Sequence, residues 1–309
     1  MTAPKTLAVI GGGTMGAGIC QEAAVAGLDV VTVEVDPKAT EAGRARIARG
    51  VDRGISKGKI AAAEREKILG RVQFTPDLSA AGAADFVIEA APEDEALKRD
   101  IFARLDSTCR AGVILASNTS SISITRIAAA TRRPERVIGM HFFNPVPAMR
   151  LVEVIRGLAT SDDTFAATRD LALNLGKTPV EVHDFPGFVS NRVLMPLINE
   201  AVYALMEGVA SAEAIDQVMV LGMNHPMGPL ALADLIGLDV CLHVMEVLQR
   251  GHGDPKYRPC PLLRRLVDAG HLGRKTGRGF HTYPPAGGAG ERAAAAPPQS
   301  SAPSSEPGR

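Results

Sequence analysis

A short apolar run that passes directly into a cluster of glycines most constrains the fold of this chain. Residues 7–20 read LAVIGGGTMGAGIC, so a strand-like segment leads into Gly11, Gly13 and Gly16 and then into a helix-compatible sequence. Glycines at these spacings let the chain turn sharply, bring bare backbone close to a pyrophosphate and pack the next helix against the sheet. The pattern predicts the first βαβ unit of a Rossmann-type domain, which binds a dinucleotide.

A second apolar run, residues 30–33, ends at Glu34. In a Rossmann unit an acid at this place binds the hydroxyls of the adenosine ribose, and its charge repels the 2′-phosphate of NADP. Residues 35–37 contain no arginine that could receive that phosphate. We therefore predict NAD(H) as the cofactor. The alternative is that Glu34 is an ordinary strand-end acid that opens a turn.

Strand-like and helix-like segments alternate through the first 184 residues. Expected strands recur at residues 86–88, 113–115, 137–139, 151–155 and 179–182, helical stretches include 95–109 and 164–175, and residues 38–70 read as a two-helix insertion joined near 54–58. This alternation predicts an α/β domain over residues 1–184 with a doubly wound, mainly parallel sheet. Its ligands should bind at the carboxyl ends of the strands.

From residue 185 onward the pattern becomes helical. Helical periodicity covers residues 188–206, 212–221, 230–235, 240–248 and 262–269, and Pro186-Gly187 is the expected hinge. We predict a second, all-helical domain over residues 185–283. Residues 284–309 are nearly all Ala, Gly, Pro, Ser and charged residues, a composition that predicts a disordered tail.

The composition argues against several classes of partner. With 34 basic and 34 acidic residues the formal charge is zero, so neither nucleic acid nor an anionic membrane is expected as the main partner. No apolar run approaches the ~20 residues that span a bilayer, and the first strand leaves no room for a signal peptide, so we expect a cytoplasmic protein. The four cysteines lie far apart without a CxxC pair, which predicts no metal site and no disulfide framework.

The candidate proton-transfer residues are His141 and Glu153. His141 ends the expected strand that starts at Val137, where it would face the cofactor crevice, and imidazole suits reversible proton transfer at neutral pH. Glu153 alternates with apolar neighbours, as a buried acid that needs a partner would, and pairing would orient the imidazole. The alternatives are a structural histidine and an ion pair between Glu153 and Arg150 or Arg156.

Two further polar segments should reach the same crevice. Residues 117–121 read SNTSS after an expected strand, and they supply more hydroxyls and amides than one helix cap needs, although some could cap a helix starting at Ile122. Asn191 lies on the first helix after the hinge, where it could reach across the cleft or bond locally.

Six segments together closely resemble the L-3-hydroxyacyl-CoA dehydrogenases, and most of all the bacterial 3-hydroxybutyryl-CoA dehydrogenases. The segments are GGGTMGAGI, ASNTSS, HFFNPVPAMRLVEVIRG, DFPGFVSNR, NHPMGPLALADLIGLD and GRKTGRGF. They occur in order between about Leu7 and Tyr283. The tail lies outside the resemblance.

The resemblance implies the reversible oxidation of a (3S)-3-hydroxyacyl-CoA to the 3-ketoacyl-CoA, with hydride passing to NAD⁺. His141 falls on the general base and Glu153 on the acid that orients it. Ser120 falls on the serine that hydrogen-bonds the substrate oxygen, and Asn191 on an asparagine that helps to hold the substrate's oxygens. Asn144 matches a residue that supports the same network. Likeness alone favours short acyl chains, four carbons first.

The resemblance also implies the cofactor contacts. Glu34 takes the ribose position, where many relatives carry Asp. Glu93, Lys98 and Asn118 match contacts around the nicotinamide ribose and phosphates, and Lys275 matches a late cofactor-side lysine.

Coenzyme A and a second copy of the chain are the partners that the resemblance implies. Lys57, in a basic helical insertion, aligns roughly with a CoA contact, although it could equally be a charge on a solvated helix face. In the family the helical domain forms a dimer interface, so we expect a homodimer. Fatty acid metabolism is among the pathways that such an enzyme could serve.

Two other functions remain open from the sequence. Related dehydrogenases act on free hydroxy acids with a similar fold and catalytic pair, and for them the basic insertion would have no CoA to bind. A non-catalytic NAD-binding protein is the second alternative. The presence of His141, Glu153, Ser120 and Asn191 together argues against it.

Overall fold

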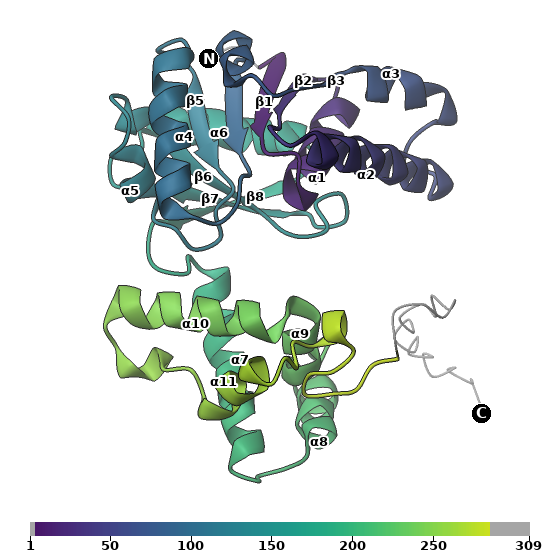
Figure 1. The fold of residues 1–309 in the computed structure, drawn as a ribbon, viewed down its shortest axis with the longest axis vertical. Helices are drawn as coiled ribbons and strands as arrows, with labels where there is room; N and C mark the ends of the chain where they lie inside the picture. Colours follow the sequence, from purple (N-terminus) through teal and green to yellow (C-terminus); the bar gives the residue numbers. More distant parts are fainter. Residues whose placement is uncertain (1–3, 285–309) are drawn as a thin grey trace, which may run out of the picture. The chain divides into compact units, whose positions relative to one another are not determined.

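A computed structural model describes residues 4–284 of the chain as a large α/β region followed by helices (Figure 1). By their contacts these residues form two compact units, residues 4–200 with 242–259 and residues 201–241 with 260–284. The predicted domain boundary between residues 184 and 185 stays a prediction. Apart from Pro284, the predicted tail lies outside the described residues. No helix within residues 4–284 is both long and apolar enough to cross a membrane.

The first unit is built on one eight-stranded sheet. Its strands are β1 (Thr6–Ile10), β2 (Asp29–Val33), β3 (Val72–Thr75), β4 (Phe86–Glu89), β5 (Ile114–Ser117), β6 (Val137–Phe142), β7 (Leu151–Arg156) and β8 (Thr178–His183). Their order in space is β3-β2-β1-β4-β5-β6-β7-β8. All neighbours pair in parallel except β6 and β7, which are antiparallel. The predicted doubly wound, mainly parallel sheet is therefore confirmed.

Helices cover both faces of this sheet. They are α1 (Thr14–Val25), α2 (Pro37–Ser56), α3 (Arg65–Gly70), α4 (Glu95–Thr108), α5 (Ile124–Ala128) and α6 (Asp162–Asn174), with short 3₁₀ turns η1 (Ala62–Glu64), η2 (Leu78–Ala83) and η3 (Pro134–Arg136). Successive strand residues point to opposite faces, so Leu7 and Val9 join one buried core, and Ala8 and Ile10 join the other. Side chains of α1, α2, α3 and α6 fill the first core, and side chains of α4 and α5 fill the second. Burial on both faces explains why these strands read as continuous apolar runs.

Two local features differ from the sequence expectation. Strand β3 was not expected, because Val72-Gln73-Phe74-Thr75 is short and only half apolar, yet it pairs with β2 at the edge of the sheet. The insertion contains the two expected helices, but α3 begins only at Arg65, after η1.

The remaining helices follow residue 189. They are α7 (Ser190–Met206), α8 (Ala212–Gln217), α9 (Pro229–Ile236), α10 (Leu238–His252) and α11 (Pro261–Asp268), together with a π-helical turn η4 (Val218–Gly222) and 3₁₀ turns η5 (Pro255–Tyr257) and η6 (Arg274–Thr276). The expected helix over residues 212–221 thus ends as an α-helix at Gln217 and continues as η4. The predicted helical character of the C-terminal region is confirmed.

Buried acids organise the second unit. Asp234, on α9, is 1% exposed and accepts hydrogen bonds from the backbone N–H groups of Phe280 and His281 and from the Tyr283 hydroxyl. Asp216, on α8, accepts from the N–H groups of Leu230 and Ala231 in the first turn of α9 and lies 2.8 Å from His281 Nε2. The two carboxylates therefore hold residues 280–283 against α8 and α9.

Candidate active site

The three glycines of the first loop have three different surroundings. Gly11 follows β1 with φ +103°, a backbone conformation that favours glycine, and a Cβ there would lie 2.7 Å from the carbonyl oxygen of Ala90. A Cβ on Gly16 would overlap the carbonyl oxygen of Gly11, so this glycine lets α1 pack against the loop. Gly13 is the residue before α1, and a Cβ there would meet nothing within 4 Å. Gly11 thus provides the turn, Gly16 the close packing of α1, and Gly13 the open space in front of the helix.

The N-terminus of α1 has the properties of a phosphate site. Gly13 precedes the helix and has no side chain that could cap its first turn, and that turn contains no acidic residue. The first N–H groups of a helix carry partial positive charge and favour an anion. The open space around Gly13 leaves room for one, so these residues fit the pyrophosphate of a dinucleotide.

Glu34 lies where β2 ends and faces the glycine loop. Its Oε2 accepts a hydrogen bond of 2.8 Å from the Gly12 N–H, and its Oε1 accepts one of 3.2 Å from the Asp36 N–H. Val35 is exposed beside it. The structure therefore places a carboxylate beside the loop, at the position from which an adenosine ribose would be bound.

His141 and Glu153 are brought together by strand pairing. The two residues are direct partners in the antiparallel ladder of β6 and β7, and His141 Nδ1 lies 2.8 Å from Glu153 Oε2. Both side chains are buried, and the His141 ring packs against the rings of Phe143 and Phe188 at centroid distances of 4.7 and 6.0 Å. The register of β6 against β7 thus determines that these two residues meet.

Glu153 is held as a carboxylate by donors from a third segment. Its Oε1 accepts from the Ser190 N–H at 2.9 Å, and its Oε2 accepts from the Ser190 hydroxyl at 2.9 Å. Burial disfavours the charged form, but the hydrogen bonds from His141 and Ser190 outweigh it, and the pKa of Glu153 lies below its ordinary value. The alternative partner Arg156 instead pairs with Asp162 and Glu181.

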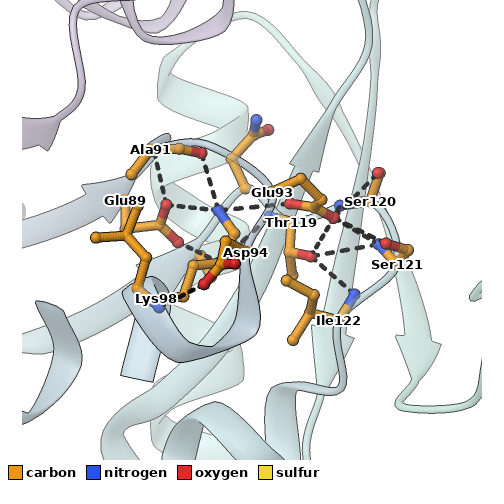
Figure 2. A network of polar contacts seen from close by, with 12 residues as sticks. Glu89, Ala91, Glu93, Asp94, Lys98, Thr119, Ser120, Ser121 and Ile122 are labelled. Carbon is orange, nitrogen blue, oxygen red and sulfur yellow. Dashed lines mark hydrogen bonds and ion pairs between the residues drawn. The ribbon is translucent and has the colours of Figure 1, made fainter. Parts of the chain in front are cut away.

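The segment after β5 is organised by Glu93 (Figure 2). Glu93 Oε1 accepts hydrogen bonds from the Thr119 hydroxyl at 2.7 Å and from the backbone N–H groups of Ser120 and Ser121 at 2.9 and 3.0 Å. The hydroxyls of Ser120 and Ser121 also donate to it. One carboxylate therefore sets the conformation of the loop that carries Ser120.

Helix capping does not account for this polar segment. The helix expected from Ile122 begins at Ile124 as α5, and its cap is Ser123, whose hydroxyl accepts from the Arg126 N–H. Ser117 is buried, and its hydroxyl donates to Glu89 at 2.6 Å. Residues 117–121 therefore do not cap α5. The Thr119 hydroxyl accepts locally from the Ile122 N–H at 2.9 Å, while Ser117 bonds to Glu89 and Ser120 to Glu93.

Asn118 and Asn191 each make one side-chain hydrogen bond to the backbone of another segment. The Asn118 Oδ1 accepts from the Phe142 N–H at 2.9 Å, which ties the end of β5 to the residue after His141. The Asn191 Nδ2 donates to the Ser120 carbonyl oxygen at 3.0 Å. The structure thus links Ser120 and Asn191, and it joins Asn118 to the strand of His141.

Three other predicted site residues have different surroundings within the described residues. Lys57 caps the C-terminus of α2, and its side chain is exposed. Asn144 follows β6 and is exposed, and its side chain makes no hydrogen bond within the described chain. Lys275 belongs to the second unit, where its ammonium lies 2.6 and 2.7 Å from the two carboxylate oxygens of Asp239. Their proposed roles stay predictions.

Sequence reasoning missed two residues of the cluster, Glu89 and Ser190. Glu89 ends the apolar run of β4, and an acid that closes such a run was a detectable signal. Ser190 contacts Glu153, which lies 37 residues earlier in the chain. The residues around Ser190 do not indicate this contact.

Family comparisons cover nearly the whole described chain. The model of the 3-hydroxyacyl-CoA dehydrogenase NAD binding domain matches residues 6–185. The model of the 3-hydroxyacyl-CoA dehydrogenase C-terminal domain matches residues 187–283.

Individual proteins are similar over the same length. A Bacillus subtilis (strain 168) protein named "Probable 3-hydroxybutyryl-CoA dehydrogenase" is 59% identical over 279 residues, which cover 90% of this chain and 97% of the relative. The 3-hydroxybutyryl-CoA dehydrogenase of Bradyrhizobium diazoefficiens is 52% identical and is covered to 95%. The crystal structure of an (S)-3-hydroxybutyryl-CoA dehydrogenase from Ralstonia eutropha matches with a TM-score of 0.89 and 53% identity, over 91% of this chain and 100% of that one.

Proposed function

Because the chain belongs to the 3-hydroxyacyl-CoA dehydrogenase family, we propose that it interconverts (3S)-3-hydroxybutyryl-CoA and acetoacetyl-CoA with NAD as the hydride carrier. NAD-dependent 3-hydroxyacyl-CoA oxidation is the reaction of the family. The observation that carries the proposal for this chain is the buried hydrogen bond between His141 and Glu153.

His141 is the proposed general base. Glu153 is a carboxylate that accepts the hydrogen bond from Nδ1, so Nε2 is the nitrogen left with a free lone pair. In the oxidation direction Nε2 takes the proton of the substrate's 3-hydroxyl while the C3–H bond breaks and the ketone forms. NAD⁺, when bound, supplies the acceptor for the hydride from C3. Glu153 then stabilises the imidazolium that results.

Ser120 and Asn191 are the proposed substrate-positioning residues. Their direct hydrogen bond holds them together, and Glu93 fixes the backbone of Ser120. We assign the Ser120 hydroxyl to the 3-oxygen of the substrate, and the Asn191 amide to the same group of oxygens. Asn144, exposed after β6, completes this network in the proposal.

The cofactor residues follow from the glycine loop. Gly11, Gly13 and Gly16 form the turn that receives the pyrophosphate, and Glu34 binds the adenosine ribose. Glu93, Lys98, Asn118 and Lys275 are the proposed residues on the nicotinamide side. The carboxylate of Glu34 is the feature that favours NAD over NADP.

Lys57 is the proposed contact for coenzyme A. The phosphates of CoA are anionic, and the exposed Lys57 ammonium lies in a helical insertion that also carries several arginines. Its contribution should weaken with salt, as expected for an exposed charge. Placement in the cytoplasm and in fatty acid metabolism belongs to the same proposal.

A homodimer is part of the proposal, and the second unit has the surface for it. Large apolar side chains are exposed there in and around α8, η4 and α9: Val209, Val218, Leu221, Met223 and Leu235. α8 packs against both η4 and α9, and exposed apolar side chains on neighbouring elements can form the contiguous patch that marks an interaction surface. Light scattering should give the mass of two 32.4 kDa chains, and Leu221→Glu should reduce it. The matched control is Leu158→Glu at an equally exposed leucine of the first unit. A wild-type mass of one chain would contradict the dimer.

The function is tested by following NADH oxidation with acetoacetyl-CoA. NADPH with the thioester, and NADH with free acetoacetate, are the two controls. Rapid turnover only with NADH and the thioester supports the proposal. Turnover of the free acid would instead indicate a hydroxy-acid dehydrogenase, and NADH binding without any turnover would indicate a non-catalytic protein.

A further inference from the structure

Glu89 is a buried acid at the carboxyl end of β4 that none of the proposed roles uses. It is 0% exposed. Its Oε1 accepts from the Ala91 N–H and from Lys98 Nζ, each at 2.6 Å (Figure 2). Its Oε2 accepts from the Ser117 hydroxyl at 2.6 Å. A charge in such a position is tolerated only because it is paired and hydrogen-bonded. Glu89 therefore joins β4, β5 and α4 around one carboxylate.

Lys98 extends from α4 into the same buried region. It is 1% exposed, and its ammonium also donates to the Ala91 carbonyl oxygen at 3.1 Å and lies 3.5 Å from Glu93 Oε2. Two of the three N–H groups of the ammonium thus donate to Glu89 and Ala91, and Glu93 lies at ion-pair distance. Lys98 therefore connects Glu89 with Glu93, in addition to the cofactor contact that the proposed function assigns to it.

Glu93 is the third charged residue of this group, after Glu89 and Lys98. Its Oε2 faces Lys98, while its Oε1 receives the donors of Thr119, Ser120 and Ser121. Burial raises its pKa, but the Lys98 ammonium and these hydrogen bonds outweigh burial, so the pKa of Glu93 lies below its ordinary value. The side chain is 32% exposed, in contrast to Glu89 and Lys98. Glu93 is therefore the most accessible member of the group.

We propose that Glu89 is a positioning residue, whose buried charge holds the Lys98 ammonium so that Lys98 fixes Glu93 against the loop that carries Ser120. The proposal rests on the proposed function, which assigns Glu93 to the cofactor and Ser120 to the substrate. Stability alone does not explain the arrangement. A buried ion pair adds little net stability compared with apolar residues of similar volume, whereas this one orients a third, ligand-facing carboxylate.

The test uses Glu89→Gln, Lys98→Met and the double variant, with Asp106→Asn as the matched control. Asp106 lies on the same helix α4 and is buried in an ion pair with Arg133, but it makes no contact with Glu93 or Ser120. For each variant one measures the free energy of unfolding, the NADH Kd by fluorescence, and kcat and KM for acetoacetyl-CoA.

Each single variant leaves a buried charge uncompensated and should lose stability, as should the control. Glu89→Gln and Lys98→Met should also lower kcat and weaken NADH binding by at least ~10-fold, the size expected when a charged hydrogen bond is lost. Asp106→Asn should keep the wild-type kcat and Kd at temperatures below its Tm.

The double variant tests whether the loss of kcat and NADH affinity follows the loss of stability. Because it removes both charges, it should regain stability relative to the single variants, while kcat and NADH affinity stay low. Recovery of kcat and Kd together with stability would overturn the proposal, as would wild-type kinetics in Glu89→Gln. If a single variant does not fold, the double variant still decides. An inactive wild type would count against the proposed function instead, and the NADH Kd would still test Glu89.

Discussion

His141 and Glu153 stand directly opposite each other on the antiparallel strands β6 and β7, with Nδ1 of the imidazole 2.8 Å from Oε2 of the carboxylate. Such pairing fixes both backbones, so the hydrogen bond needs no reorganisation when substrate enters. Ser190 adds two donors to the same carboxylate from the start of α7. A base oriented by a buried acid is an arrangement suited to the proton transfer that accompanies alcohol oxidation.

The contribution of Glu153 to stability should depend on pH. Its folded-state pKa lies below its ordinary value of 4.5, so the stability it adds is present above about pH 4.5 and is lost as pH falls through the folded pKa. Glu153→Gln should therefore reduce the free energy of unfolding by about 1–3 kcal/mol near pH 7 and by much less in strong acid. Urea unfolding at the two pH values measures this.

Glu181→Gln on β8 is the control for that experiment, because its carboxylate makes an exposed ion pair with Arg156. Such a pair contributes about 0–1 kcal/mol, so its loss should be small at both pH values. An equal loss for Glu153→Gln at neutral and acid pH would contradict the account of its pKa.

Cofactor choice should depend on Glu34. Glu34→Ala combined with Val35→Arg removes the charge that repels a 2′-phosphate and adds one that attracts it. The ratio of kcat/KM for NADPH to that for NADH should rise by roughly tenfold or more, which corresponds to about 1.4 kcal/mol. Glu34→Ala alone should weaken NADH binding, because the Gly12 N–H also loses its acceptor, and it should not produce the same rise in the ratio. An unchanged ratio would mean that Glu34 is only a strand-end acid.

The end of the second unit should be essential up to Tyr283 and dispensable beyond it. A chain that ends at Tyr283 should keep its stability and turnover. A chain that ends at Gly279 removes the Phe280, His281 and Tyr283 donors of the buried Asp234 and should lose at least about 1 kcal/mol of stability. Thermal unfolding of the two truncated chains compares them. Equal stability of both, or a clear loss in the chain ending at Tyr283, would contradict this expectation.

The sequence predicts those parts of the site that rest on local patterns. The glycine loop can be predicted because each glycine meets a local requirement: a sharp turn, close packing or an open backbone. The contact between His141 and Glu153 could be anticipated because each lies on an apolar strand, and a buried acid needs a partner. The identification of Ser120 and Asn191 came from resemblance, because a polar loop and a helical asparagine have several ordinary uses.

The rest depends on tertiary contacts that no local pattern encodes. Lys98 reads as a surface charge on an amphipathic helix, yet it is buried because β4 places Glu89 beneath it. Ser190 is an ordinary helix-start serine until the fold brings it to Glu153. Strand β3 was missed because its pairing with β2, rather than its own composition, makes it a strand.

The central claim is that His141 transfers the proton, and His141→Gln tests it most directly. With acetoacetyl-CoA and NADH, kcat should fall at least ~10²-fold, the low end for loss of a general base or acid, while the NADH Kd stays at the wild-type value. Glutamine keeps the polarity and much of the volume of the imidazole, so the fold should be retained. A kcat close to that of the wild type would remove His141 from the mechanism and contradict the account.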